Sequence, residues 1–183
     1  MENKQSQFSK ISKDIKNIKI QGARNIAIAG FKAYKLIPTQ SSKDKLLKLR
    51  TTEPMLANIL SKADILTEKQ LNQKLKNNQD KINTHVFKLI KNNSVIFTHC
   101  HSSSVIQALI YAKKKAKKFE VYNTETRPLY QGRKTAKELK NAKINVTMFV
   151  DSALGVALSK EQGTKKADLV LLGADAILKK GVI

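Results

Sequence analysis

Two side chains in the second half of the chain could exchange protons with a substrate. Cys100 follows a short apolar run and precedes a serine-rich segment, and Asp175 follows another apolar run and two small residues. A thiol near the start of a helix meets free backbone N–H groups and the positive end of the helix dipole, which lower its pKa. A carboxylate at the partly dry end of a strand can have a raised pKa and act as a general base. The pair therefore predicts acid and base chemistry, with an inert buried thiol as the alternative for Cys100.

Each of these residues belongs to a polar cluster at the end of an apolar run. The runs are Ser94–Phe97, Phe119–Tyr122, Val146–Val150 and Asp168–Leu172. The clusters that follow them are Thr98–Ser103, Thr124–Pro128, Asp151–Ala153 and Gly173–Ala176. Segments with helical spacing separate the runs, which predicts parallel strands joined by helices. Since the carboxyl ends of parallel strands face one edge of a sheet, we expect the four clusters to converge on one site.

The arginines are placed more selectively than the lysines. Lysine and arginine together number 35, but only four are arginines, and all four lie at predicted element boundaries: Arg24, Arg50, Arg127 and Arg133. The arginine fork binds phosphate or carboxylate in a bidentate way that lysine cannot match. This placement predicts anion recognition, with structural ion pairs as the alternative.

Other polar residues near the predicted site have two interpretations each. The backbone amides of Ser102 and Ser103 could cradle a phosphate at a helix start, although serines there also serve as ordinary caps. His99 and His101 flank Cys100, but neighbours on a strand point to opposite faces, so at most one shares a pocket with the thiol. One cysteine with this spacing disfavours a Cys-His metal site. For Asp151 we favour a structural role as a helix N-cap.

The first half of the chain has helical patterns. We expect a helix within Ile20–Ile37, interrupted by Gly30 and ended by Pro38, a short helix over 43–49, a helix from Pro54 to about Leu66, and a helix opened by the capping box Thr67–Gln70 and reaching Lys91. The predicted fold is therefore α/β, with a small helical N-terminal domain (1–93) followed by a parallel-sheet Rossmann-like domain (94–183). Because the fourth strand would be an uncovered apolar edge, we expect the second domain to be truncated at its C-terminus.

Composition restricts the classes of function. The formal net charge of +21 is compatible with nucleic-acid binding, but the lysines are spread along the chain, aromatic residues are only 5%, and no nucleic-acid-binding motif occurs. Solvated lysine faces are the preferred interpretation, and we expect no specific nucleic-acid partner. No apolar run reaches the roughly 20 residues of a membrane span, and the N-terminus lacks the apolar stretch of a signal peptide. Together with the single cysteine, this predicts a cytoplasmic protein without membrane contact.

Several segments resemble one protein family. Ile20–Arg24, Arg50–Pro54, Thr98–Ser103, Thr124–Leu139, Val146–Ala153 and Ala167–Ile177 are similar, in this order, to the family that unites the alpha, beta and delta subunits of translation initiation factor 2B with two sugar-phosphate isomerases. Two sequence motifs are closest to those of the archaeal ribose-1,5-bisphosphate isomerases: Thr-Glu-Thr-Arg-Pro-Leu-Tyr-Gln-Gly-Arg and Gly-Ala-Asp-Ala. His101 departs from the asparagine often found at its position in the isomerases.

The resemblance implies an activity and a set of site residues. Cys100 and Asp175 would be the catalytic pair, which the regulatory subunits usually lack. The phosphorylated pentose would be held by Gly22, Ala23, Arg24, Arg50, Thr51, Ser102, Ser103, Arg127 and Gln131. The implied reaction converts ribose-1,5-bisphosphate to ribulose-1,5-bisphosphate in a homo-oligomer, without a metal or other cofactor. The alternative is a non-enzymatic subunit whose partner is translation initiation factor 2.

Overall fold

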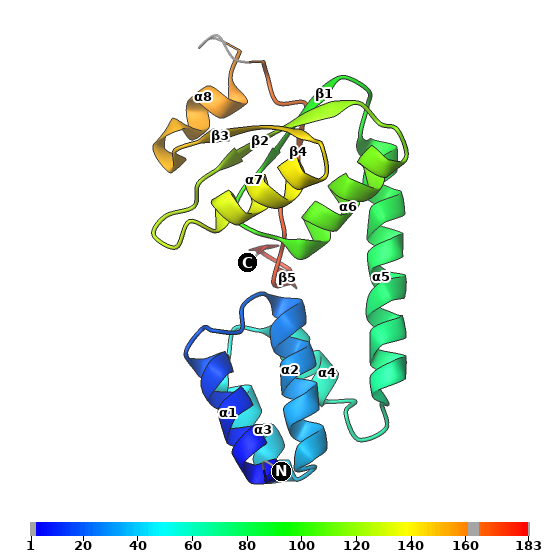
Figure 1. Ribbon diagram of the computed structural model, residues 1–183, viewed down its shortest axis with the longest axis vertical. Coiled ribbons are helices and arrows are strands. Elements are labelled where there is room, and N and C mark those ends of the chain that lie inside the picture. The colour runs from blue at the N-terminus through cyan, green and yellow to red at the C-terminus, as the bar shows by residue number, and fades with distance from the viewer. Residues whose placement is uncertain (1–2, 161–164, 183) are drawn as a thin grey trace. The chain divides into compact units, whose positions relative to one another are not determined.

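Helices alone make up the first half of the described chain. The structure, a computed structural model, describes residues 3–160 and 165–182. The helices of this half are α1 (Lys4–Lys16), α2 (Ala23–Leu36), α3 (Gln40–Leu49), α4 (Pro54–Leu60) and α5 (Glu68–Leu89) (Figure 1). The predicted capping box is confirmed, because Thr67 Oγ1 accepts from the Gln70 N–H at 3.2 Å and Gln70 Oε1 accepts from the Thr67 N–H at 2.9 Å.

Three details of the helical prediction were wrong. Helix α3 begins at Gln40 and not at 43, because Thr39 is its N-cap and accepts from the Ser42 N–H. Helix α2 continues through Gly30, whose missing Cβ makes room for the Leu56 side chain of α4, so this glycine serves helix packing. Helix α4 ends at Leu60 and does not reach Leu66. The residues beyond it form a turn in which the Asp64 carboxylate accepts hydrogen bonds from the Tyr34 hydroxyl and, at 2.7 Å, from Lys43 Nζ. These bonds tie the turn to α2 and α3.

The second half forms the predicted parallel sheet. Its strands are β1 (Ser94–Thr98), β2 (Phe119–Thr124), β3 (Asn145–Phe149) and β4 (Leu169–Val170), in the order β3-β2-β1-β4, and every pairing is parallel. The helices between them are α6 (Ser103–Lys114), α7 (Gln131–Asn141) and α8 (Leu154–Leu158), the last preceded by a 3-10 turn at Asp151–Ala153. A short antiparallel hairpin of β5 (Ile177–Leu178) and β6 (Gly181–Val182) follows. The predicted combination of helices with a parallel α/β sheet is confirmed.

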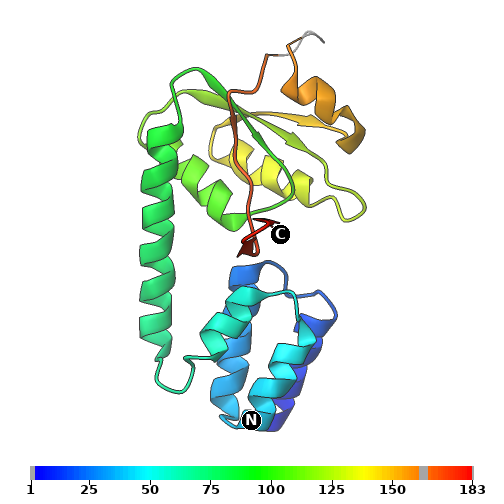
Figure 2. The same ribbon diagram turned by 180° about the vertical axis from the view of Figure 1, so that it is seen from behind.

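Helices cover both faces of the sheet. Helices α6 and α7 cover one face (Figure 1). On this face Ile96 and Val121 belong to a core with Ile106 and Leu109 of α6 and Leu139 of α7. On the other face, Val95, Phe97 and Tyr122 pack with Ala157 of α8. Figure 2 shows helix α8 from the opposite side. Because both faces of β1 and β2 are covered, their residues are buried without alternation, except for the half-buried Glu120.

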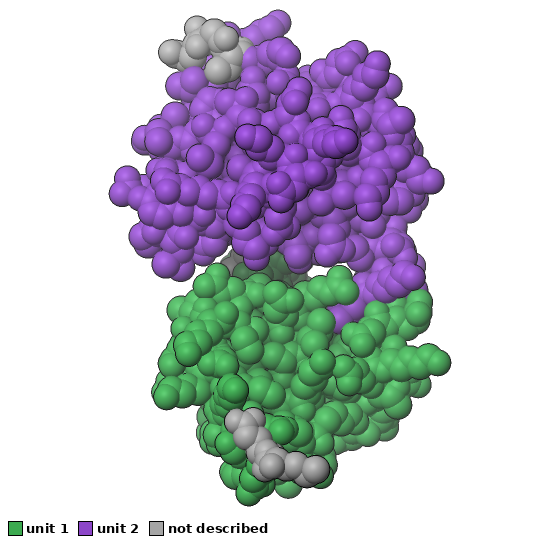
Figure 3. Space-filling view, viewed as in Figure 1, with its two compact units in different colours: residues 1–74, 174–183 green, residues 75–173 purple. Residues whose placement is uncertain are grey.

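The chain forms two compact units, coloured separately in Figure 3. Unit 1 contains residues 1–74 and 174–183, and unit 2 contains residues 75–173. The C-terminal part of α5 belongs with the sheet, because Val86 and Phe87 pack against the core that also holds Ile90. The domain division between residues 93 and 94 stays a prediction, since a division by contacts does not test where an independently folding domain begins.

Helix α7 can approach β2 only because residue 132 is a glycine. A Cβ at Gly132 would overlap the carbonyl group of Thr124. The Gly132 N–H donates to the Glu125 carbonyl at 3.2 Å, and its own carbonyl accepts from the Asn123 side-chain amide at 2.9 Å. This close approach places the first turn of α7 beside the carboxyl end of β2.

We expect Gly132→Ala to destabilise the protein by about 1 to 3 kcal/mol, the usual cost of forcing extra atoms into a packed region. Urea unfolding followed by circular dichroism measures the change. Gly155→Ala in α8 is the matched control, because nothing lies within 4 Å of its added Cβ. Equal stability of the two variants would show that α7 does not depend on this close approach.

Candidate functional site

Cys100 lies at a sharp turn between β1 and α6. Its φ of 61° is in the left-handed region, which ends the extended backbone of the strand. The Cys100 N–H donates to Thr126 Oγ1 at 3.0 Å, and the Cys100 carbonyl accepts from the Thr135 hydroxyl at 2.7 Å. Two hydroxyls from β2's exit loop and from α7 therefore hold the backbone of a half-buried thiol two residues before the N-cap of α6.

The two histidines beside Cys100 contact different elements. The His99 ring hydrogen-bonds the Thr124 hydroxyl at the end of β2. His101 Nδ1 lies 3.2 Å from Thr135 Oγ1 in α7. Since the single Thr135 hydroxyl proton goes to the Cys100 carbonyl, His101 must donate from Nδ1, which leaves Nε2 facing Glu138 at 3.8 Å. Burial and the nearby Lys134 charge lower the pKa of His101, while the Glu138 charge opposes this shift.

Asp151 holds the loop that follows β2. Its two carboxylate oxygens accept from the backbone N–H groups of Thr126 at 2.8 Å and Arg127 at 2.7 Å. These bonds, that of Arg127 most strongly, lower the pKa of Asp151. Asp151 therefore has a structural role, as predicted, but it is not the predicted N-cap. Its carboxylate binds the backbone N–H groups of a neighbouring loop and not those of its own helix.

The predicted phosphate-binding serines lie at the N-terminus of α6. Ser102 is the N-cap, and its hydroxyl accepts from the Val105 N–H at 3.4 Å. The backbone amide of Ser103 is among the first-turn donors that no helix carbonyl can reach, and such donors suit an anion. Gly173, beyond β4, passes so close to Ser102 that an added Cβ would lie 2.6 Å from the Ser102 Cβ.

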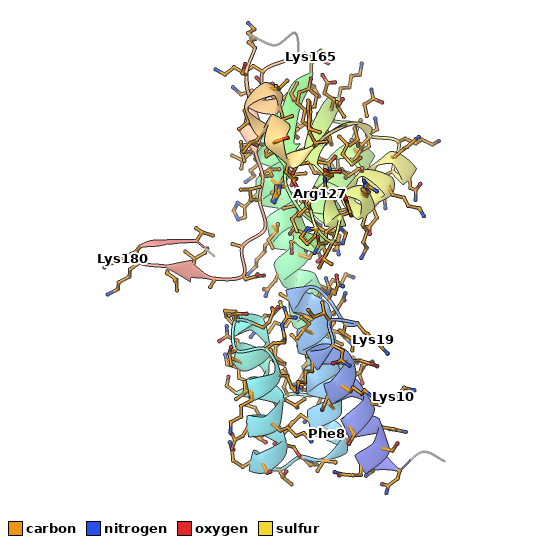
Figure 4. The ribbon with its side chains drawn as sticks, turned by 90° about the vertical axis from the view of Figure 1, so that its left-hand side faces the viewer. Phe8, Lys10, Lys19, Arg127, Lys165 and Lys180 are labelled. Carbon is orange, nitrogen blue, oxygen red and sulfur yellow. The ribbon has the colours of Figure 1, made fainter. Side chains whose placement is uncertain are left out.

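The segment after β2 presents two arginines and a tyrosine. Arg127, labelled in Figure 4, is exposed. Its guanidinium lies 5.5 Å from the centre of the Tyr130 ring. Arg133 lies over the same ring at 3.9 Å and pairs with Glu125 at 3.3 Å. Gln131 opens α7 directly after Tyr130. The ion-pair interpretation therefore holds for Arg133.

Unit 1 contains the remaining predicted residues. Gly22 is the N-cap of α2 with a φ of 83°, which favours glycine, and Ala23 and Arg24 form the first turn of this helix. Arg50 pairs with the buried Glu53 at 3.1 Å, so the ion-pair interpretation holds for this arginine too, and Thr51 follows it in an exposed turn.

The pKa of Glu53 depends in part on the charge of Asp175, the other predicted catalytic residue. Burial raises the pKa of Glu53, the negative charge of Asp175 raises it further, and the Arg50 pair opposes both. Glu53 Oε2 is buried without a hydrogen-bond partner. Asp175 itself is exposed.

Within unit 2 the carboxyl ends of all four strands meet, as predicted. Hydrogen bonds join the exit of β1 to that of β2 and the exit of β2 to that of β3, and the exit of β4 reaches the start of α6 at Gly173. Cys100 belongs to unit 2 and Asp175 to unit 1. Their pairing across one substrate stays a prediction.

Sequence patterns missed three residues that shape this edge. Thr126 and Thr135 position the Cys100 backbone, and Gly132 admits the approach of α7. Threonine is common in strands and helices, so its type carries no signal of this role. Gly132, at the first turn of a predicted helix, was a detectable exception to helix propensity. Among residues 3–160 and 165–182, no group of three or more His, Cys, Asp or Glu side chains could hold a metal ion.

Comparisons with known proteins show the family of the chain. Residues 61–183 match the Initiation factor 2 subunit family. The chain belongs to this family. A Methanocaldococcus jannaschii protein named ribose 1,5-bisphosphate isomerase is 31% identical over 92% of this chain, and a Pyrococcus furiosus protein named as translation initiation factor eIF-2B subunit 2-like is 28% identical over 95%. The chain spans 61% of the first family member and 68% of the second.

The fold is also that of the family. The crystal structure of the Pyrococcus horikoshii OT3 translation initiation factor eIF-2B superposes with a TM-score of 0.81 at 24% sequence identity, covering 95% of this chain and 68% of that one. In the described part of the chain, no helix is long and apolar enough to cross a membrane.

We expect Asp151→Asn to destabilise the protein at neutral pH but not at low pH. The folded-state pKa of Asp151 is depressed, so its contribution is complete above the unfolded-state pKa of about 3.9 and is lost as the pH falls through the lower folded value. Urea midpoints of wild type and variant at about pH 6 and pH 3 measure this, and a difference that persists unchanged at pH 3 would contradict it.

We also expect opposite effects of two neighbours on His101. Its pKa should lie below 6.5, Lys134→Gln should raise it, and Glu138→Gln should lower it further. Because the pKa of His101 is lower in the folded state, the unfolded chain binds more protons at this residue. The free energy of unfolding therefore decreases as the pH falls below 6.5. NMR titration of the ring Cε1 proton measures each pKa, and shifts of the same sign in both variants would contradict the assigned neighbours.

Proposed function

We propose that this protein is an aldose-ketose isomerase that converts ribose-1,5-bisphosphate to ribulose-1,5-bisphosphate. The observation that carries the proposal is the position of Cys100, held by two hydroxyls at the edge where the strand ends meet and at the approach to the N-terminus of α6. The name of the Methanocaldococcus jannaschii relative supports this choice of substrate.

The first proposed step opens the sugar ring. With its C1 oxygen phosphorylated, the ring opens only when the C1–O4 bond breaks and O4 receives a proton. The Cys100 thiol supplies that proton and becomes a thiolate, which the positive end of α6 stabilises. The C2–OH proton is released later in the reaction and restores the thiol.

The second proposed step moves a proton between carbons. Asp175 removes the proton from C2 and returns it at C1, so that C2 becomes the ketone and C1 carries the phosphate on a CH₂ group. The balance needs no oxidant, reductant or metal. A carboxylate performs this step best in a site that is shielded from water. The proposed mechanism therefore requires Asp175 and Cys100 to contact the same bound substrate.

The phosphates require separate donors. We assign one phosphate to the amides of Ser102 and Ser103 and to Arg127, whose guanidinium is exposed and forms no ion pair with a carboxylate of the described residues. Gly22, Ala23, Arg24, Arg50, Thr51 and Gln131 complete the proposed substrate-binding set. Arg50 would have to divide its donors between Glu53 and the phosphate.

A regulatory subunit is the second candidate. Arg50 and Arg133 are held by carboxylates, which is the behaviour of structural arginines, and the Pyrococcus furiosus relative carries a translation initiation factor name. Such a protein would need the sheet as a binding surface and would not need the thiol.

Turnover of ribose-1,5-bisphosphate, followed by NMR of the product, tests the proposal. We expect Cys100→Ser and Asp175→Asn each to lower the rate by about 10² to 10⁴, the usual contribution of a general acid or base. Asp80→Asn, at an exposed aspartate in the second half of α5, is the matched control and should retain the rate.

Two outcomes would reject the isomerase. Rates of both site variants equal to wild type would remove Cys100 and Asp175 from the chemistry. A folded wild type without turnover, verified by circular dichroism, would favour the regulatory subunit.

A further inference from the structure

Lysines, most of them exposed, gather at the amino-terminal edge of the sheet, opposite the candidate site. Ser94 of β1 pairs with Phe119 of β2, and Glu120 of β2 pairs with Asn145 of β3, so these strands begin at nearly the same level. The segments that lead into the strands contain a group that we call the amino-edge lysines: Lys91, Lys113, Lys114, Lys115, Lys117, Lys118, Lys143, Lys165 and Lys166. Register therefore brings together lysines from four separate parts of the chain.

Hydrogen bonds hold two of these segments together. The Asn93 N–H donates to the Lys118 carbonyl at 2.6 Å, and the Lys118 N–H donates to Asn92 Oδ1 at 3.0 Å. Lys117 differs from its neighbours, because its Nζ donates to the Ile90 carbonyl at 2.7 Å and lies over the Phe87 ring. Lys117 fastens the loop, and the exposed lysines around it project from a fixed backbone.

Acidic residues compensate little of this charge. In segments 91–94, 113–120, 143–145 and 165–168, the acidic side chains are Glu120 and Asp168. Glu120 pairs with Lys165 at 2.5 Å, the lysine labelled in Figure 4, and Asp168 accepts from the Val95 N–H at 2.8 Å. Both carboxylates are thus engaged, Glu120 by Lys165 and Asp168 by the backbone of β1, and the charge of the 113–118 run remains.

Helix stabilisation does not account for the cluster. Lys113 and Lys114 lie in the last turn of α6, where a cation favours the helix dipole. That effect ends within the last turn, whereas Lys91, Lys118 and Lys143 lie outside helices. Their concentration at one edge suits a partner with many negative charges.

We propose that the amino-edge lysines bind the phosphate backbone of nucleic acid without reading its sequence. Lysine contacts to phosphates release counterions, which provides affinity without base recognition. Phe119, the aromatic residue of the four segments, is buried. Phe87 and Tyr111 near this edge are half-buried and lie beneath Lys117 and Lys115, so these rings offer no stacking surface for bases. Arginines, which read guanine best, are absent from the four segments.

An anionic membrane fits this surface less well. Peripheral membrane binding usually combines basic charge with inserted apolar groups. Two large apolar side chains close to the four segments in sequence are exposed, Leu89 at 58% and Val170 at 50%, and Val170 pairs with Phe97 toward the exit of β1. The five residues of β1 separate this edge from the candidate site by roughly 16 Å at 3.3 Å per residue, so bound nucleic acid would leave the site open.

Salt-dependent binding of a fluorescent single-stranded RNA of about 20 nucleotides tests the proposal. The edge variant combines Lys91→Gln, Lys114→Gln, Lys115→Gln and Lys118→Gln, all at exposed positions of unit 2. The matched control combines Lys4→Gln, Lys10→Gln, Lys62→Gln and Lys69→Gln, which remove the same charge from exposed positions of unit 1. Circular dichroism verifies that both variants fold.

We expect the slope of log K against log salt concentration to fall by about 3 in the edge variant, since each single-strand contact contributes about 0.7. The control variant should retain nearly the wild-type slope, and RNAs of different sequence should bind equally. Equal loss in both variants would show diffuse charge instead of a surface. Absence of RNA binding at about 50 mM salt, a clear sequence preference, or binding to phosphatidylserine vesicles in place of RNA would each overturn the proposal.

Discussion

The in-register parallel pairing of β1 with β2 determines where every chemically capable group of unit 2 lies. Five residues of β1 pair with five of β2, from Ser94 with Phe119 to Thr98 with Asn123. Both strands are buried on both faces, so a shift of one residue would move apolar side chains such as Ile96 and Val95 to the wrong helices. Once this register is set, all strand exits face one edge and all strand entries face the other.

At the exit edge, polar contacts convert strand ends into a shaped site. Asp151 accepts two backbone N–H groups of the loop after β2, and Thr126 of that loop accepts the N–H of Cys100. Thr135 adds a bond from α7 to the Cys100 carbonyl. Each bond satisfies a backbone group that the sheet leaves unpaired where its ladder ends, which is why loops of irregular conformation can be held firmly here. Pre-organisation of this kind is what acid and base chemistry requires.

The two edges differ in charge for a physical reason. Helices that follow parallel strands begin near the strand exits and end near the strand entries, so their positive ends face the exit edge and their negative ends face the entry edge. Anion-binding amides therefore belong at the start of α6, and lysines are tolerated and favoured near its end. The proposed sugar-phosphate site and the proposed nucleic-acid surface follow the same polarity, and neither obstructs the other.

The family relationship is consistent with both proposed functions, because the family contains proteins named as isomerases and as initiation factor subunits. The distinguishing groups are few. Cys100 and Asp175 matter for the enzyme, whereas the pairing of Arg50 with Glu53 and of Arg133 with Glu125 removes two of the four arginines from simple phosphate binding. Retained arginine was thus a less specific signal of anion binding than its rarity suggests, because guanidinium forks also suit buried carboxylates.

The sequence by itself determined the periodic features of this protein. Apolar runs between turn residues specified the parallel strands, the Thr67–Gln70 capping box specified the start of α5, and the polar clusters after the strands marked the exit edge. These features are local or repeat with a fixed period, so they can be read without long-range contacts.

Only the tertiary structure decided the long-range pairings. The end of α4, the passage of α2 through Gly30, and the carboxylate of Asp151 turning to Thr126 and Arg127 depend on partners distant in sequence. The concentration of lysines at the entry edge depends on strand register in the same way, because the chain spreads them over more than seventy residues. A hydrogen bond or a close approach between distant segments leaves no periodic trace in either segment, and therefore only the folded chain reveals it.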